Sequence, residues 1–199
     1  MTLHRKTVFT LILVLSAAMS SGSSFAHSGE VYVGGFLGGL THPILGWDHV
    51  AAMVAVGLLG AFLGSPAIWI LPVVFPLVMA LGAAMGILGL PLPAVETGIA
   101  MSAVVFGLMI VFTVKPPIWI SALVVGAFAV FHGYAHGTEL PETANAFAFT
   151  GGFVVASGML HMYGIACGLL ASLRGGRMVV RGVGGAISLA GMAFLTSVA

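Results

Sequence analysis

Residues 66–89 read PAIWILPVVFPLVMALGAAMGILG, a run of 24 residues without a charged side chain. An α-helix rises about 1.5 Å per residue, so about 20 apolar residues cross the hydrocarbon core of a bilayer. The whole chain has the same character, since 60% of its residues are hydrophobic and 6% are charged. Its mean hydropathy is +1.19, whereas a soluble domain carries about 25% charged residues. The sequence therefore predicts an all-α, polytopic membrane protein.

Five further stretches are predominantly apolar and have about the length of a span. Short loops that contain Pro or Gly separate them, such as Gly64-Ser65-Pro66 and Lys115-Pro116-Pro117. These loops leave no room for a soluble domain. We expect a single domain over residues 27–199 with six transmembrane helices, near 43–63, 66–89, 94–114, 117–136, 144–171 and 178–198.

The first 26 residues have the features of a cleaved signal peptide. Arg5 and Lys6 form the positive end, residues 8–18 the apolar stretch and Ser24-Phe25-Ala26 the cleavage site. An uncleaved first transmembrane helix is the alternative, although the apolar run is short for a span. In both cases residue 27 begins outside the cytoplasm.

The positive charges agree with this orientation. Six crossings from an external N-terminus put Lys115, Arg174 and Arg177 in cytoplasmic loops, with Arg181 about one turn into the last helix, as the positive-inside rule requires. We therefore expect a protein of the bacterial inner membrane with both termini in the periplasm.

The stretch from residue 31 to residue 64 is too long for one spanning helix, because its 34 residues would reach about 51 Å. Gly38-Gly39 and Pro43 are the natural places for a break. We expect a short interfacial or re-entrant segment over about 31–41, then a helix that opens near Pro43. Backbone freed at such a break faces protein or a polar cavity, as at the ion sites of transporters.

Few ionisable side chains remain at membrane depth, and such residues are costly and mark functional sites. His42 and His49 are seven residues apart and would share one face of a helix, while His132 and His136 are four apart. The residues that we expect to form one site are His42, Asp48, His49, His132, His136 and Glu139.

The polar residues of the two segments are expected at the same depth in the membrane. At about 1.5 Å per residue, Asp48 and His49 lie about 8 to 9 Å below Pro43, and His132 lies about 6 Å below His136. Both groups then occupy the outer layer of the membrane and converge if their helices are neighbours. The chain has one cysteine, which excludes a thiolate cage, and imidazoles with carboxylates suit Ni²⁺, Co²⁺, Zn²⁺ or Fe²⁺.

Other interpretations of these polar residues stay open. A single histidine often does no more than bond between helices, and chains of His and Asp also relay protons. His161 lies deeper, toward the cytoplasmic half, as either an inner metal ligand or a packed polar contact. Signal cleavage would give His27 a free amine beside its imidazole, which makes it a candidate for metal capture.

Two of these motifs resemble the signatures of a known family. Residues 42–49, HPILGWDH, fit the pattern His-Pro-x-x-Gly-x-Asp-His of the HupE/UreJ family, and residues 131–139, FHGYAHGTE, resemble its second signature. The likeness extends over essentially the whole chain. It implies a secondary nickel permease, with cobalt as the substrate of some members, linked to hydrogenase or urease maturation.

We therefore expect a secondary transporter that imports Ni²⁺ or Co²⁺ as its substrate, with no permanent cofactor and no enzymatic activity. No phosphate-binding loop is present to support ATP-driven transport. A membrane metalloenzyme and a metal-binding assembly factor without flux are the alternatives. The expected partners are the metal ion and the bilayer; a net charge of +1 gives no reason to expect nucleic acid. The oligomeric state stays open, a homo-oligomer included.

Overall fold

A computed structural model describes residues 35–140 and 145–198 of the chain. The predicted signal peptide over residues 1–26 and the candidate ligand His27 lie outside these residues. Within them the chain is all-helical, as predicted. The helices are α2 (Phe36–Leu45), α3 (Trp47–Leu63), α4 (Ala67–Ile87), α5 (Val95–Val111), α6 (Ile118–Thr138), α7 (Ala146–Leu169), the 3₁₀ turn η1 (Leu170–Ser172) and α8 (Gly176–Val198).

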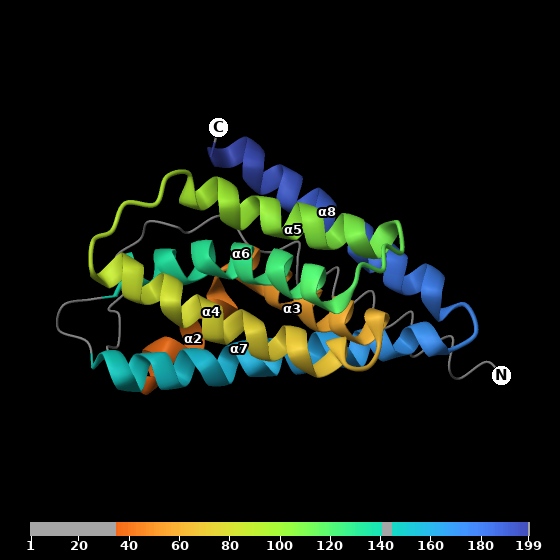
Figure 1. Ribbon diagram of the computed structural model, residues 1–199, viewed down its shortest axis with the longest axis horizontal. Coiled ribbons are helices and arrows are strands. Elements are labelled where there is room, and N and C mark those ends of the chain that lie inside the picture. The colour runs from red at the N-terminus through yellow and green to blue at the C-terminus, as the bar shows by residue number, and fades with distance from the viewer. Residues whose placement is uncertain (1–34, 141–144, 199) are drawn as a thin grey trace. The chain divides into compact units, whose positions relative to one another are not determined.

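The helices have the length and composition of a multi-pass membrane protein. Among the described residues, four helical stretches are long and apolar enough to cross a bilayer: α4, α6, α7 extended through η1, and α8. The pair α2 and α3 makes a fifth if it is counted as one broken span. Helix α5 is apolar but has only 17 residues. In Figure 1, the axes of α4, α5 and α7 are roughly aligned, and the chain runs through α4 in the opposite direction to α5 and α7.

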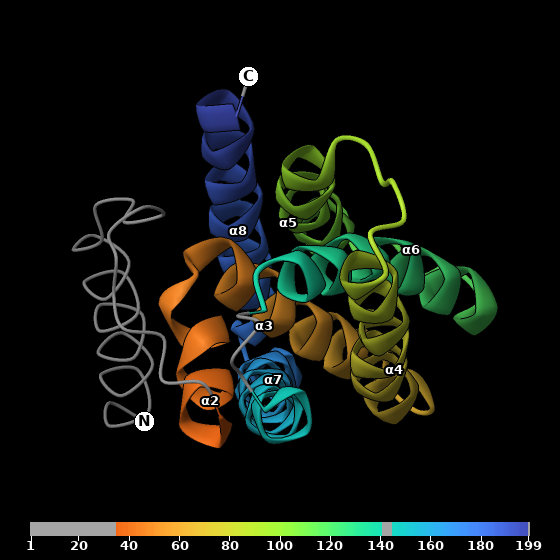
Figure 2. The same ribbon diagram turned by 90° about the vertical axis from the view of Figure 1, so that its left-hand side faces the viewer.

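The break before the first long helix exists, but its predicted position is wrong. Helix α2 continues through Gly39 and Pro43, and the chain turns by 86° between α2 and α3, at Gly46. The backbone of Gly46 is extended, and its carbonyl accepts the first hydrogen bond of α3 from Val50 N–H at 2.9 Å. Figure 2 shows α2 beside α7 and turned away from α3. His42 and His49 therefore lie on two helices rather than on one helix face.

Gly46 explains why the turn comes where it does. A Cβ atom on Gly46 would lie 3.0 Å from Nδ1 of His49 and 3.1 Å from Oδ1 of Asp48. The missing side chain leaves room for this polar pair to fold back over the end of α2. Proline is tolerated within α2, as in other membrane helices where neighbouring elements cover the freed carbonyl.

Glycines let the helices pack in close pairs. A Cβ atom on Gly133 of α6 would overlap the backbone of Met79 and Ala83 on α4, and one on Gly57 of α3 would overlap the backbone of His161 on α7. Small residues of this kind draw membrane helices together where no hydrophobic force acts between them. This packing fixes the backbones that carry the histidines.

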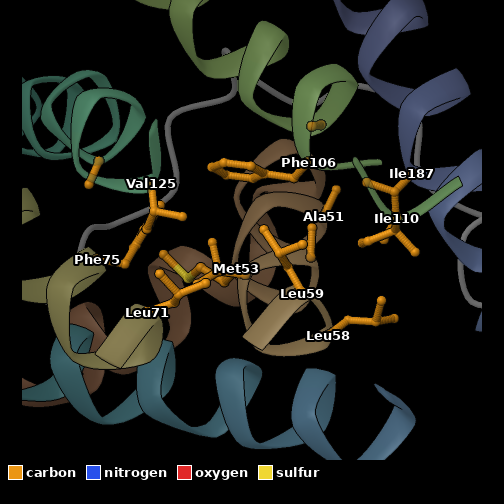
Figure 3. Packing of buried hydrophobic residues seen from close by; sticks show 14 of the residues in the cluster. Ala51, Met53, Leu58, Leu59, Leu71, Phe75, Phe106, Ile110, Val125 and Ile187 are labelled. Atoms are coloured by element: carbon orange, nitrogen blue, oxygen red, sulfur yellow. The ribbon is translucent and has the colours of Figure 1, made fainter. Parts of the chain in front are cut away.

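A buried apolar cluster lies between the helices. Met53 of α3, Phe75 of α4 and Phe106 of α5 are fully buried in it. Figure 3 shows side chains from α3, α4, α5, α6 and α8 converging there. Positive side chains lie at one end of the bundle: Nζ of Lys115 lies 5.2 Å from the ring centre of Phe62, and Nε of Arg181 donates to Val111 O at 2.8 Å.

Candidate metal centre

The last two turns of α6 carry two buried imidazoles. His132 and His136 are 0% and 6% exposed, and their spacing of four residues places both on one side of the helix. The helix passes through Gly137 and ends at Thr138, so that Glu139 is its C-cap and donates its N–H to Ala135 O at 3.0 Å. The carboxylate of Glu139 and the negative end of the helix dipole both favour a cation at this end of α6.

Helix α2 brings a third imidazole to the same place. Nε2 of His42 lies 3.3 Å from Oε2 of Glu139, and the His42 ring centre lies 4.8 Å from that of His136. Potential ligand atoms of His42, His136 and Glu139 all lie within 4.8 Å of one another. These three side chains can share one ion.

The first turn of α3 supplies a fourth imidazole with its carboxylate. Oδ1 of Asp48 accepts the backbone N–H of His49 at 2.9 Å and lies 2.8 Å from its ring Nδ1. A carboxylate is only an acceptor when it is ionised, so the neutral His49 ring donates Nδ1–H and keeps its lone pair on Nε2. Asp48 thereby fixes the orientation of His49.

The four imidazoles form a bent row with His136 at the bend, since the ring centres of His42 and His49 are themselves 6.5 Å apart. The ring centres lie 4.8 Å apart from His42 to His136, 4.5 Å from His136 to His49 and 5.0 Å from His49 to His132. The Glu139 side chain at one end is 51% exposed, whereas His132 at the other end is fully buried. The row, defined here as His42, His136, His49 and His132, leads from the surface into the bundle.

Several nitrogens of this row are buried without a hydrogen-bond partner among the described residues. They are Nε2 of His49, Nδ1 of His132 and both ring nitrogens of His136. A buried polar atom without a partner is costly, and native proteins keep few of them. Nitrogen lone pairs that face no donor are what a divalent transition metal binds. The donor set therefore fits such an ion.

A serine from a neighbouring helix contacts the inner end of the row. The hydroxyl of Ser102 on α5 lies 2.9 Å from Nε2 of His132 and donates to Ile99 O at 2.6 Å. Ser102 is fully buried.

His161 lies near the inner end of the row and contacts the same phenylalanine as His132. The ring centre of Phe75 is 5.4 Å from that of His132 and 5.5 Å from that of His161. His161 is 1% exposed, and its Nε2 has no hydrogen-bond partner among the described residues. The structure thus places His161 next to the row, with the ring of Phe75 in contact with both His132 and His161.

Comparison with known proteins agrees with the two motifs. The family model described as HupE / UreJ protein matches residues 13–194. The chain belongs to the HupE/UreJ family. Protein HupE of Rhizobium leguminosarum bv. viciae is 45% identical over 181 residues, which cover 91% of this chain and 94% of that protein. No solved structure matches the chain significantly.

In this HupE/UreJ chain, the structure gathers six of the predicted site residues and leaves His161 one ring away. The prediction missed two contacts, those of Ser102 and Phe75. A serine in an apolar helix normally bonds to its own backbone, and a phenylalanine there is normally core, so neither residue type gives a signal. Only the packing of α5 and α4 against α6 reveals them.

Proposed function

We propose that this protein is a secondary transporter that imports Ni²⁺, or Co²⁺, across the bacterial inner membrane from the periplasmic side. The observation that carries the proposal is the row of four imidazoles, which begins at the half-exposed carboxylate of Glu139 and ends at fully buried His132. A resident structural ion needs a closed cage. A row that leads inward suits an ion that moves.

Glu139 and His42 form the entry in this proposal. Glu139 lies at the C-terminal end of α6, and His42 lies on α2. They offer an oxygen and a nitrogen ligand to an ion that sheds part of its water. His136 lies next to both His42 and His49 and accepts the ion from the entry pair. A site of nitrogen and oxygen donors selects Ni²⁺, Co²⁺ or Zn²⁺ over Mg²⁺ and Ca²⁺, which prefer oxygen alone.

His161 receives the ion on the inner side of Phe75. The ring of Phe75 contacts both His132 and His161, and in this proposal it blocks the path until the ring or one of the histidines rotates. Such a barrier prevents an open pore, which a secondary transporter must avoid. The membrane potential drives the inward movement in this proposal, and it is worth about 2.3 kcal/mol per charge and 100 mV, hence about 4.6 kcal/mol for a divalent ion.

The family supports the choice of metal. The resemblance of residues 42–49 and 131–139 to the HupE/UreJ signatures implies nickel, with cobalt in some members, and a link to hydrogenase or urease maturation. We propose both for this chain. In this assignment both termini are periplasmic, and the metal ion is a substrate rather than a cofactor.

Uptake of radioactive Ni²⁺ into proteoliposomes with an internally negative potential tests the proposal. We expect uptake by the unaltered protein, loss of most uptake in His49→Ala, and none of that loss in Thr196→Ala, an exposed position on α8. Undiminished uptake in His49→Ala would overturn the site. Tight Ni²⁺ binding without flux would instead identify a metal-binding assembly factor, and turnover of an added compound a metalloenzyme.

A further inference from the structure

We propose that Ser102 is a positioning residue, which fixes the tautomer of His132 so that its Nδ1 presents a lone pair to the transported ion. This inference rests on the proposed function. It concerns a residue of α5 that neither motif of the sequence contains. Its basis is a count of protons in one buried hydrogen-bond network.

The serine hydroxyl has one proton and two acceptor lone pairs. Ser102 donates this proton to Ile99 O, because the carbonyl has no proton to give and the oxygens lie 2.6 Å apart. The hydroxyl oxygen can then only accept at its second contact, Nε2 of His132 at 2.9 Å. His132 therefore carries its proton on Nε2. In a neutral imidazole the other nitrogen, Nδ1, is left with the lone pair.

Burial makes this assignment consequential. Ser102 and His132 are both fully buried, so water does not compete for the bond, and a hydrogen bond is stronger at low dielectric. Nδ1 of His132 is buried without a hydrogen-bond partner among the described residues. In the opposite tautomer Nδ1 of His132 would carry the proton, and a protonated ring nitrogen has no lone pair to bind a cation.

The neighbouring histidine is arranged in the same manner. Asp48 accepts from Nδ1 of His49 at 2.8 Å, and Nε2 of His49 has no hydrogen-bond partner within the part of the chain that the structure describes. The ring centres of His49 and His132 lie 5.0 Å apart. Two adjacent imidazoles of the row are thus each held through one nitrogen and left open at the other. Metal-binding histidines usually have such an outer partner, and its removal costs about 10- to 100-fold in affinity.

The first test reads the tautomer without any metal. Ring-¹⁵N NMR of the full chain, with His132 assigned by a His132→Gln variant, should show protonated Nε2 and bare Nδ1 in the unaltered protein. Ser102→Ala should shift the His132 signals toward the other tautomer, and Ser102→Thr, which keeps the hydroxyl, should not. A protonated Nδ1 in the unaltered protein would overturn the inference.

The second test measures Co²⁺ binding by its visible absorption. We expect Ser102→Ala to weaken binding at least tenfold and to change the spectrum, while Ser121→Ala should do neither. Ser121 is the matched control, since it is fully buried and bonds to Pro117 O near the other end of α6. The effect of Ser102→Ala should vanish in a His132→Ala background.

The two failures are distinguishable. If the unaltered protein binds no Co²⁺ or Ni²⁺, the proposed function fails, and the NMR result still decides the tautomer. If it binds metal and Ser102→Ala binds equally well with the same spectrum, the inference about Ser102 fails and the proposed function stands. An equal loss in the presence and absence of His132 would show a purely structural role and would also overturn the inference.

Discussion

The carboxylate of Asp48 accepts two hydrogen bonds, both from His49. The sequence predicts Asp48 as a metal ligand because carboxylates at membrane depth are rare. The side-chain geometry favours a different role, which is to orient the His49 ring. The sequence alone does not separate the two roles, because a metal ligand and the outer partner that orients a ligand both belong to the same site.

Two substitutions at Asp48 separate these roles. Asp48→Ala removes the acceptor, so the His49 ring can rotate, and we expect Ni²⁺ binding to weaken at least tenfold. Asp48→Asn keeps an acceptor oxygen and should retain an intermediate affinity. Equilibrium binding to the purified protein measures both, with Thr196→Ala as the control. If the asparagine variant binds as weakly as the alanine variant, the carboxylate is itself a ligand.

His136 is the residue where function and stability should oppose each other. Both of its ring nitrogens are buried and without a hydrogen-bond partner among the described residues. Replacement by an apolar side chain of similar size removes this cost, about 1–3 kcal/mol for an unsatisfied group. We expect His136→Leu to unfold at the same or a higher temperature without metal, and to lose Ni²⁺ binding and uptake.

Thermal unfolding in detergent, with and without Ni²⁺, checks this prediction. The unaltered protein should gain stability when Ni²⁺ is added, because a ligand that binds only the folded state raises the unfolding temperature. His136→Leu should gain none. A lower unfolding temperature without metal would show that the imidazole is a stabilising core group instead.

At the scale of elements, the sequence predicts that the first long segment breaks but not where. Pro43 and Gly38-Gly39 are the residues that local preference selects, yet α2 runs through all of them. The turn at Gly46 depends on two side chains further along, since Asp48 and His49 occupy the space that a Cβ would fill. A tertiary contact of this kind is invisible to local propensity.

Gly46→Ala should therefore damage the site more than the fold. The backbone φ of Gly46 is −89°, which any residue adopts, so no backbone strain follows. The new methyl would press on Nδ1 of His49 and Oδ1 of Asp48, each of which must move by a few tenths of an ångström. We expect weaker Ni²⁺ binding with an unchanged unfolding temperature. Unchanged binding would show that the pair adjusts freely.

The helix pair α4 and α6 gives a prediction about stability. A Cβ atom on Gly133 would overlap the backbone of α4, whereas one on Gly158 of α7 would meet no atom within 4 Å. Gly133→Ala should lower the free energy of unfolding by about 1–3 kcal/mol through overpacking. Gly158→Ala is the matched control and should be neutral or slightly stabilising, because alanine is the better helix former. Unfolding of both variants in detergent measures the difference.

At the scale of the whole molecule, the directions of the packed helices agree with six alternating crossings. Gly82 of α4 lies against Val130 of α6, and Gly86 lies against Tyr134. Residue numbers rise together along both helices, so α4 and α6 are parallel. Alternating crossings make the second and fourth spans parallel, as observed. The sequence predicts six alternating crossings from its apolar stretches and short loops, but which helices become neighbours depends on side-chain packing and could not be predicted.

The close contacts of α5 with α8 give the complementary case. Gly107 lies against Gly184, while Gly191 lies against Val104. Residue numbers in α5 therefore fall as those in α8 rise, so the two helices are antiparallel. The third and sixth of six alternating crossings must be antiparallel. Helix α5 therefore has the direction of a spanning segment, although its 17 residues are few for a bilayer core of about 30 Å.

Labelling of single cysteines from either side of the membrane tests this topology. In a Cys167→Ser background, Ser65→Cys and Ser172→Cys should react only with a reagent that reaches the cytoplasm, while Leu90→Cys and Pro93→Cys should react from the periplasm. All four positions are exposed. If α5 did not cross, the loop after α4 and the loop before α6 would lie on one side. A cysteine at Lys115 would then react from the same side as one at Leu90, which contradicts the placement of Lys115 by the positive-inside rule.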